Sequence, residues 1–128
     1  MNMNDIDLTK LLQKANDCVP RLKYEESIAV ISSQKNLIID VREVIEVSAS
    51  GLIQGAINIP KSIFDKSFSN ELVDQYIDDI DNTNILLYCA VGVRSALVGL
   101  TLLNNGYSSV FNIGGFTDWI ENKGPLNR

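Results

Sequence analysis

Short, mostly apolar runs alternate with segments of helical periodicity along most of this chain. Runs of about four or five residues of this kind are typical of strands in a parallel sheet, whereas apolar residues three and four positions apart indicate helices. The pattern predicts strands at 37–41, 56–59, 85–88 and 109–113, and helices at 7–17, 24–33, 42–47, 95–105 and 116–121. In the more polar stretch 61–81 we expect two short helices, and at Gly114 and Gly115 we expect a turn. Strands that alternate with helices predict an α/β domain whose parallel sheet is covered on both faces.

The first 23 residues stand apart from this alternation. Leucines and an alanine at helical spacing give residues 7–17 one apolar face, and Pro20 ends the segment. We therefore expect an N-terminal helical extension at 1–23, packed on a main domain that comprises residues 24–128.

Composition and charge restrict the partners and the location. The 128 residues carry a net charge of −5 with an isoelectric point near 4.6, so no basic stripe is present to neutralise the phosphates of a nucleic acid. No apolar run reaches the length of a membrane span, and the N-terminus lacks the basic start and apolar core of a secretory signal. We expect a cytoplasmic protein with neither a membrane nor a nucleic acid as partner.

The sequence contains no histidine, which excludes Ser-His-Asp and Cys-His catalysis and zinc sites built on histidine. We expect no metal and no other cofactor. The two cysteines, Cys18 and Cys89, are expected as free thiols in a reducing compartment. Cys18 has no supporting motif around it, and we interpret it as inert.

Cys89 follows a predicted buried strand and precedes a tight loop and a helix start. Backbone N–H groups of such a loop point inward at one spot, and the helix dipole adds partial positive charge there. Arg94 contributes a full charge at the far end of the loop. This setting predicts a lowered pKa for the Cys89 thiol and a nucleophilic thiolate near neutral pH. The candidate site comprises Cys89 and Arg94 as catalytic residues and Ala90, Val91, Gly92, Val93 and Ser95 as the anion-binding loop.

Each of these residues also has a structural interpretation. Cys89 as a buried core cysteine is the alternative to a nucleophile, and Ser95 as a helix cap is the alternative to a hydrogen-bond donor for the cysteine sulfur. For Asp40 and Arg42, at the end of a predicted strand, we favour a supporting polar network over a direct chemical role.

Three separated motifs resemble the rhodanese family, specifically its small single-domain members. They lie at 40–43 with 51–60, at 88–96, and at 106–107 with 112–119. The resemblance implies a three-layer sandwich with a central parallel sheet of about five strands and helices on both faces. It also implies a sulfurtransferase, in which Cys89 takes a sulfane sulfur from thiosulfate or a persulfide and passes it to a thiophilic acceptor such as cyanide, a thiol or a protein. In that reaction Cys89 becomes a persulfide, and Arg94 closes the loop around it.

Two departures from the family pattern bear on the activity. Leu52 stands where the family usually has a histidine, although that histidine is not the nucleophile. The loop is apolar at Ala90, Val91 and Val93, where many members carry basic or polar groups. This apolar loop predicts weaker binding of thiosulfate and favours a persulfide or a protein as donor.

Two other functions compete with the sulfurtransferase. Cysteine-dependent phosphatases place five residues between cysteine and arginine, whereas four separate Cys89 from Arg94, which disfavours a phosphatase. The remaining alternative is a rhodanese-like module that carries sulfur, senses redox state or binds a protein with little turnover. The missing histidine and the apolar loop leave this alternative open.

Overall fold

A four-stranded parallel sheet forms the centre of the molecule in the computed structural model, which describes residues 3–127, with side chains from residue 7 onward. The strands lie in the order β3-β1-β4-β5, so that β1 and β4 occupy the middle. Their bounds are β1 (Lys35–Asp40), β3 (Ala56–Asn58), β4 (Thr83–Cys89) and β5 (Val110–Gly115). The apolar runs of the two central strands are explained by this position, because both faces of these strands are covered.

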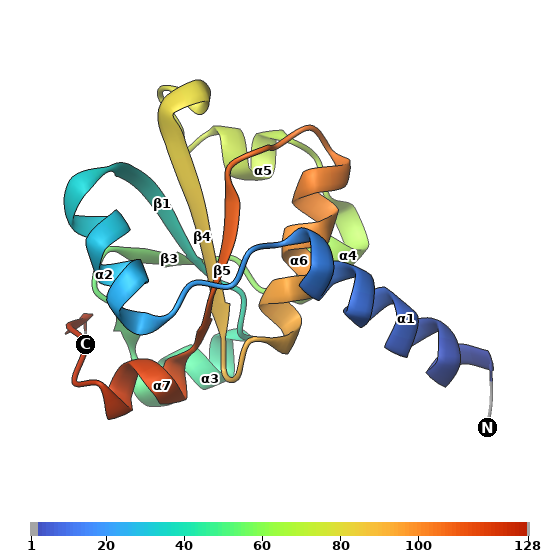
Figure 1. Cartoon of the computed structure of the whole chain (residues 1–128), viewed down its shortest axis with the longest axis horizontal. Coiled ribbons are helices and arrows are strands. Elements are labelled where there is room, and N and C mark those ends of the chain that lie inside the picture. The colour runs from blue at the N-terminus through green and yellow to red at the C-terminus, as the bar shows by residue number, and fades with distance from the viewer. Residues whose placement is uncertain (1–2, 128) are drawn as a thin grey trace.

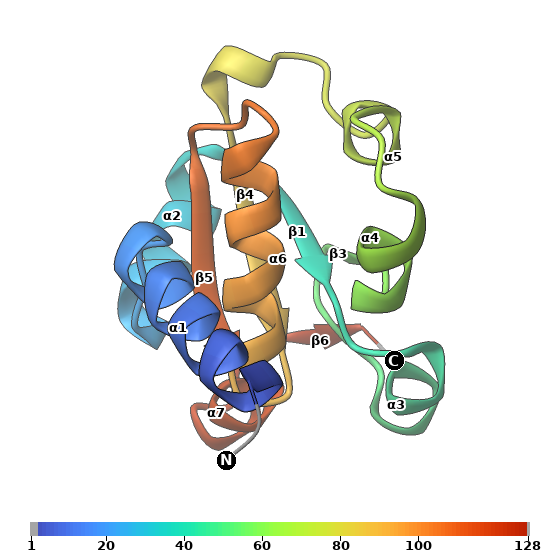
Figure 2. The same cartoon turned by 90° about the vertical axis from the view of Figure 1, so that its right-hand side faces the viewer.

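Helices cover the two faces of the sheet, as Figures 1 and 2 show. Alternate residues of a strand point to opposite faces, so Ile39 and Leu87 pack into one core while Ile38 and Leu86 pack into the other. The first core lies under α4 (Lys61–Ser67), α5 (Glu71–Asp74) and α6 (Val93–Asn104), and the second under α2 (Tyr24–Ser33) and α7 (Phe116–Glu121). The α/β fold expected from the sequence is confirmed.

The main sheet has four strands, whereas the resemblance to the rhodanese family implied about five. A further short strand, β2 (Leu52–Ile53), pairs antiparallel with β6 (Leu126–Asn127) in a separate two-stranded sheet. The pairing joins segments more than seventy residues apart, and neither is long enough to show a strand pattern by itself.

Two local expectations are also corrected. The helix predicted at 42–47 is α3 (Val44–Ser50), which begins after Glu43, whose backbone N–H donates to the Glu46 carboxylate. The second correction concerns Gly114 and Gly115, expected as a turn, which instead belong to β5, where Gly115 is in register with Cys89. The polar stretch contains α4, α5 and a 3₁₀ turn, η1 (Ile80–Asn82).

The N-terminal segment consists of α1 (Met3–Cys18) and a connection that runs beside β5. Ala15 packs with Ala96 and Leu100, so α1 lies on α6. After α1, the chain makes two backbone hydrogen bonds with Asn112. The N–H of Asn112 donates to the Pro20 carbonyl, and the carbonyl of Asn112 accepts from Leu22 N–H, both at 2.9 Å. Residues 20–22 therefore extend the edge of the sheet next to the loop that follows β4. Among residues 3–127, none of the helices combines the length and apolar character required to cross a membrane.

Candidate active site

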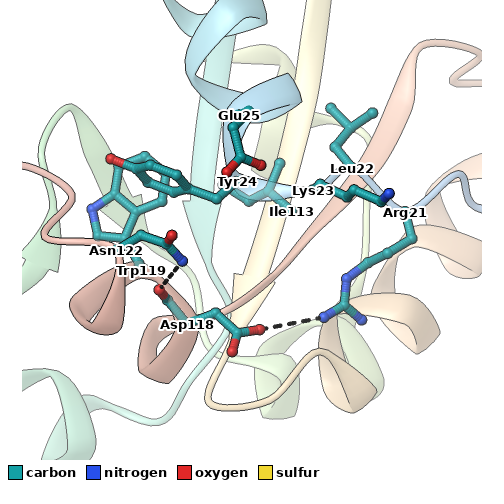
Figure 3. A pocket seen from close by; sticks show the side chains of 9 residues that line it. All are labelled: Arg21, Leu22, Lys23, Tyr24, Glu25, Ile113, Asp118, Trp119 and Asn122. Carbon is teal, nitrogen blue, oxygen red and sulfur yellow. Dashed lines mark hydrogen bonds and ion pairs between the residues drawn. The ribbon is translucent and has the colours of Figure 1, made fainter.

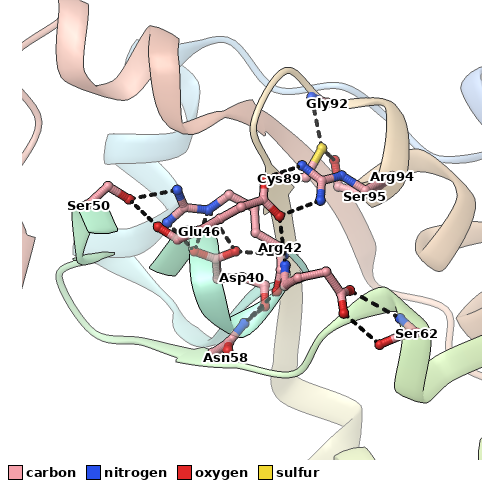
Figure 4. A network of polar contacts seen from close by, with 11 residues as sticks. Asp40, Arg42, Glu46, Ser50, Asn58, Ser62, Cys89, Gly92, Arg94 and Ser95 are labelled. Atoms are coloured by element: carbon pink, nitrogen blue, oxygen red, sulfur yellow. Dashed lines mark hydrogen bonds and ion pairs between the residues drawn. The ribbon is translucent and has the colours of Figure 1, made fainter. Parts of the chain in front are cut away.

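Cys89 ends β4 at the carboxyl edge of the sheet, and the loop after it leads directly into α6. Its side chain is 1% exposed, and its sulfur accepts a hydrogen bond from Gly92 N–H at 3.0 Å (Figure 4). Gly92 has a φ of 96°, a left-handed conformation that residues with a side chain rarely adopt. The bend at Gly92 turns its N–H back toward the sulfur, which forms the backbone cradle expected from the sequence pattern.

Opposing effects determine the pKa of the Cys89 thiol. Burial raises it, because the thiolate loses contact with water. Hydrogen bonds from the Ser95 hydroxyl and from the backbone N–H groups of Ser95, Val91 and Gly92 lower it by stabilising the thiolate. The hydrogen bonds outweigh burial, and the pKa lies below the usual value for a cysteine. The site therefore stabilises the thiolate relative to an ordinary cysteine, and the thiolate is the nucleophilic form.

Ser95 connects the cysteine to a buried amide. The Ser95 Oγ lies 3.5 Å from the Cys89 Sγ and donates to Asn112 Oδ1 at 2.8 Å. A hydroxyl has a single proton to donate. When Cys89 is a thiol, its S–H can donate to Ser95 while Ser95 donates to Asn112; when Cys89 is a thiolate, the Ser95 proton is required at the sulfur. Ser95 is thus placed to respond to the ionisation of the cysteine.

Asn112 is a site residue that the sequence did not reveal. It lies on β5, is 2% exposed, and donates from Nδ2 to the Gly92 carbonyl at 2.9 Å. Its Oδ1 accepts from both Ser95 and Gly114 N–H. Two signals were available, its place at the start of the motif 112–119 and a polar amide within the apolar strand run 109–113, and neither identifies its partners.

Arg94 makes a bidentate ion pair with Glu46 of α3, at 2.7 and 2.9 Å (Figure 4). The hydrogen bonds from Arg94 lower the pKa of Glu46 to about 2, against the opposing effect of partial burial. The pKa of Arg94 is raised by its hydrogen bonds to Glu46 and also by the nearby charge of Cys89 and a hydrogen bond to it. Arg94 therefore lies between a carboxylate and the cysteine sulfur. Sequence reasoning identified Arg94 but did not identify Glu46.

Asp40 and Arg42, at the end of β1, form a second and buried ion pair. The Arg42 guanidinium donates to both carboxylate oxygens of Asp40 and to the Gly51 carbonyl, and it lies 4.2 Å from the centre of the Phe116 ring. A further hydrogen bond from Arg42 reaches Ser50. These contacts tie the C-terminal end of α3 to the end of β1, so the pair supports the element that carries Glu46.

The remaining loop residues form the rim of the site. Val91 and Val93 are 65% and 44% exposed, and two residues of α3, Val44 and Ile45, are 61% and 79% exposed. The Ala90 carbonyl points the other way, toward Thr117 N–H at 3.4 Å. The exposed side chains of the loop at Val91 and Val93 are therefore apolar.

Leu52 and Cys18 lie outside this cluster. Leu52 belongs to β2 and packs against the core under α2 and α7. Cys18 is exposed at the end of α1, and both cysteines are free thiols. Among the described residues, no group of three or more Cys, Asp or Glu side chains is arranged to hold a metal ion.

A pocket of about 270 Å³ lies on the α2–α7 side of the molecule, and Figure 3 shows its lining. Tyr24 and Trp119 form one wall, with their ring centres 5.1 Å apart in an edge-to-face arrangement. Arg21 and Asp118 lie at the other end, 3.9 Å apart. None of the residues predicted for chemistry lines this pocket, so the candidate site is the loop around Cys89.

Comparison with known proteins shows which family has this arrangement. The sequence profile of the rhodanese-like domain matches residues 24–122. The chain is 27% identical over 94 residues to the tRNA uridine(34) hydroxylase of Photorhabdus laumondii, covering 73% of this chain and 26% of the hydroxylase. The chain thus corresponds to a minor part of that protein.

Solved structures show the same fold. A protein of unknown function from Rhodopseudomonas palustris, described as a possible tyrosine phosphatase, superposes with a TM-score of 0.78 and 25% identity, covering 94% of this chain and 93% of that one. The human single-domain sulfurtransferase TSTD1 superposes with a TM-score of 0.66 and 22% identity, covering 80% and 96%.

Proposed function

The chain belongs to the rhodanese-like domain family, and on this basis we propose that it is a sulfurtransferase that carries sulfur as a persulfide on Cys89. The donor is thiosulfate or a persulfide, and the acceptor is cyanide, a thiol or a protein. The observation that carries the proposal is the hydrogen bond from Gly92 N–H to the Cys89 sulfur, within a loop that lowers the pKa of the thiol.

The reaction has two displacements and needs no metal or organic cofactor. In the first, the Cys89 thiolate attacks the outer sulfur of the donor. The new S–S bond forms as the old bond to that sulfur breaks, and the leaving group departs with the electron pair as sulfite or as a thiolate. In the second, the acceptor attacks the outer sulfur of the Cys89 persulfide, and Cys89 is released as a thiolate.

The loop supplies what these displacements require. The Cys89 sulfur carries negative charge at the start of the first step, where it is the attacking group, and at the end of the second, where it is the leaving group. The N–H groups of Gly92 and its neighbours are already oriented toward this sulfur, and the positive charge of Arg94 lies close to it. Donors fixed before the reaction stabilise such charge without reorganisation.

Mass spectrometry of the intact protein tests the proposal. After incubation with thiosulfate or with an alkyl persulfide, we expect a gain of one sulfur, about 32 Da, on Cys89 and its removal by cyanide as thiocyanate. The Cys89→Ser variant should gain no sulfur, whereas Cys18→Ser should behave like the parent. A gain of sulfur by the Cys89→Ser variant, or the absence of any gain by the parent protein with every donor, would contradict the proposal.

The apolar loop, together with Leu52 in place of the usual family histidine, favours a second candidate function, a sulfur-carrier, redox-sensing or protein-binding module with little turnover. The two differ in the time course of thiocyanate formation. An enzyme continues to form thiocyanate while donor and cyanide last, whereas a carrier forms one equivalent per protein and then stops.

A further inference from the structure

Each of the three arginines within residues 3–127 lies beside a carboxylate, and two of them, Arg94 and Arg21, lie near the loop that follows β4. The charge of Arg94 is close to the cysteine, and Arg21 lies so close to Gly92 that a Cβ there would be 2.5 Å from its Nη1. Arg42 supports α3 from below. The pairs and their distances are Arg94–Glu46 at 2.7 Å, Arg42–Asp40 at 2.8 Å and Arg21–Asp118 at 3.9 Å.

The pair nearest the sulfur decides the charge that a donor meets. Glu46 holds both terminal nitrogens of Arg94, and its lowered pKa keeps it ionised at neutral pH. The two charges cancel at a distance, so once Cys89 is a thiolate the site carries one net negative charge. An approaching dianion is repelled by that charge, whereas an uncharged molecule is not.

The rim adds attraction for apolar groups. Val91 and Val93 belong to the loop around Cys89, and both side chains are exposed. A donor whose sulfur is attached to an uncharged organic group can bury that group against these side chains when it reaches the cysteine.

We propose that Glu46 is a specificity-determining residue, which neutralises Arg94 and so selects uncharged organic persulfides over sulfur-carrying dianions such as thiosulfate. The proposal rests on sulfur transfer by Cys89. In the selected reaction Cys89 takes the outer sulfur of a protonated persulfide, and the organic thiolate leaves with the electron pair.

Alkylation of Cys89 measures this electrostatic effect without any sulfur donor. In a Cys18→Ser background, the rate with iodoacetate, an anion, is divided by the rate with iodoacetamide, its neutral analogue. The ratio cancels the thiolate fraction, since both reagents need the same thiolate. We expect Glu46→Gln to raise the ratio about three- to tenfold, because one charge several ångströms away is removed.

Thiosulfate should respond more strongly, because it carries two charges. Its rate of sulfur loading onto Cys89 should rise in Glu46→Gln by roughly the square of the iodoacetate effect. The rate with an alkyl persulfide, which reacts through its protonated and uncharged form, should change less than about twofold.

Two further variants keep the result interpretable. Glu46→Asp retains the charge and should keep the low ratio of the parent. Glu43→Gln removes a charge from the same end of α3, but this carboxylate binds the Ser62 hydroxyl, so the ratio should change less than about twofold. An unchanged ratio in Glu46→Gln, or an equal rise in Glu43→Gln, would overturn the proposal. If Cys89 is alkylated as expected but gains no sulfur from any donor, it is the transferase function that fails.

Discussion

Asn112 holds the Cys89 loop by both ends of its side-chain amide. The NH₂ group fixes the Gly92 carbonyl, and this keeps the Gly92 peptide in the orientation that directs its N–H to the sulfur. The carbonyl oxygen accepts from Ser95, the hydroxyl next to the sulfur. A single buried amide therefore positions two of the groups that lower the pKa of Cys89, although it makes no contact with the sulfur itself.

Replacing Asn112 by Asp should make Cys89 less reactive at neutral pH. The carboxylate accepts from Ser95 but cannot donate to the Gly92 carbonyl, and it places a negative charge close to the thiolate. Only the thiolate reacts, so the alkylation rate increases as the pH passes the pKa of Cys89. A raised pKa therefore shifts this increase to higher pH. We expect iodoacetamide alkylation at pH 7 to slow roughly tenfold and to approach the parental rate at high pH.

The pH profile and urea unfolding together separate this positioning role from general damage to the fold. A protein that merely unfolds exposes Cys89 and also moves its titration toward that of an ordinary thiol, so the urea unfolding of Asn112→Asp must stay cooperative. The Asn112→Asp profile must therefore be displaced along the pH axis with its plateau retained. A profile that superposes on the parent would contradict the positioning role of Asn112.

At the scale of elements, the sequence predicted those whose signals are local. Helices α2 and α7 begin and end where their periodicity indicated, and each of the four sheet strands was found within a few residues. The β2–β6 sheet was missed because its pairing depends on the folded chain and not on either short segment. Gly114 and Gly115 were misinterpreted because glycines signal turns, whereas Gly115 serves here as a point of close packing between β5 and the cysteine loop.

Gly115 tests this close packing. An added Cβ would collide with the Ala90 carbonyl, although the φ of −124° is open to any residue. Gly115→Ala should therefore displace the loop, lower the free energy of unfolding by about 2 kcal/mol and slow alkylation of Cys89. The measurements are urea unfolding and iodoacetamide kinetics.

Gly106→Ala provides the matched control. Its φ of 97° is strained for alanine, but no atom lies within 4 Å of the added Cβ. The expected cost is about 1 kcal/mol with unchanged alkylation of Cys89. If Gly115→Ala alkylates like Gly106→Ala, the packing of β5 against the loop does not set the reactivity of the cysteine.

At the scale of the whole molecule, the candidate site is assembled from three distant parts of the chain. One motif contains Cys89, Arg94 and Ser95, so the sequence alone could identify them together as candidate site residues. Glu46 lies 48 residues before Arg94, and Asn112 lies 17 residues after Ser95. Their roles depend on the strand order, which brings β5 and α3 to the same edge of the sheet as Cys89. A single sequence does not specify that order.

We propose that the N-terminal segment is an extension at 1–23 on a domain of residues 24–128. The two parts of this segment make different contacts. Helix α1 packs on α6, whereas Pro20 and Leu22 hydrogen-bond to Asn112 on β5. The connection therefore lies against the strand that carries a positioning residue of the candidate site, and the two parts should differ in their effect when removed.

Removing residues 1–17 should preserve cooperative urea unfolding and the alkylation rate of Cys89, at a cost of about 2 kcal/mol from the exposed face of α6. Removing residues 1–23 should cost at least about 2 kcal/mol more, because the edge of β5 loses its hydrogen bonds and buried Val19 is lost. It should also slow the alkylation, since Asn112 loses its backbone partners. Equal effects of the two deletions would show that residues 18–23 do not support the site, and failure of the shorter one to fold would make α1 an integral part of the domain.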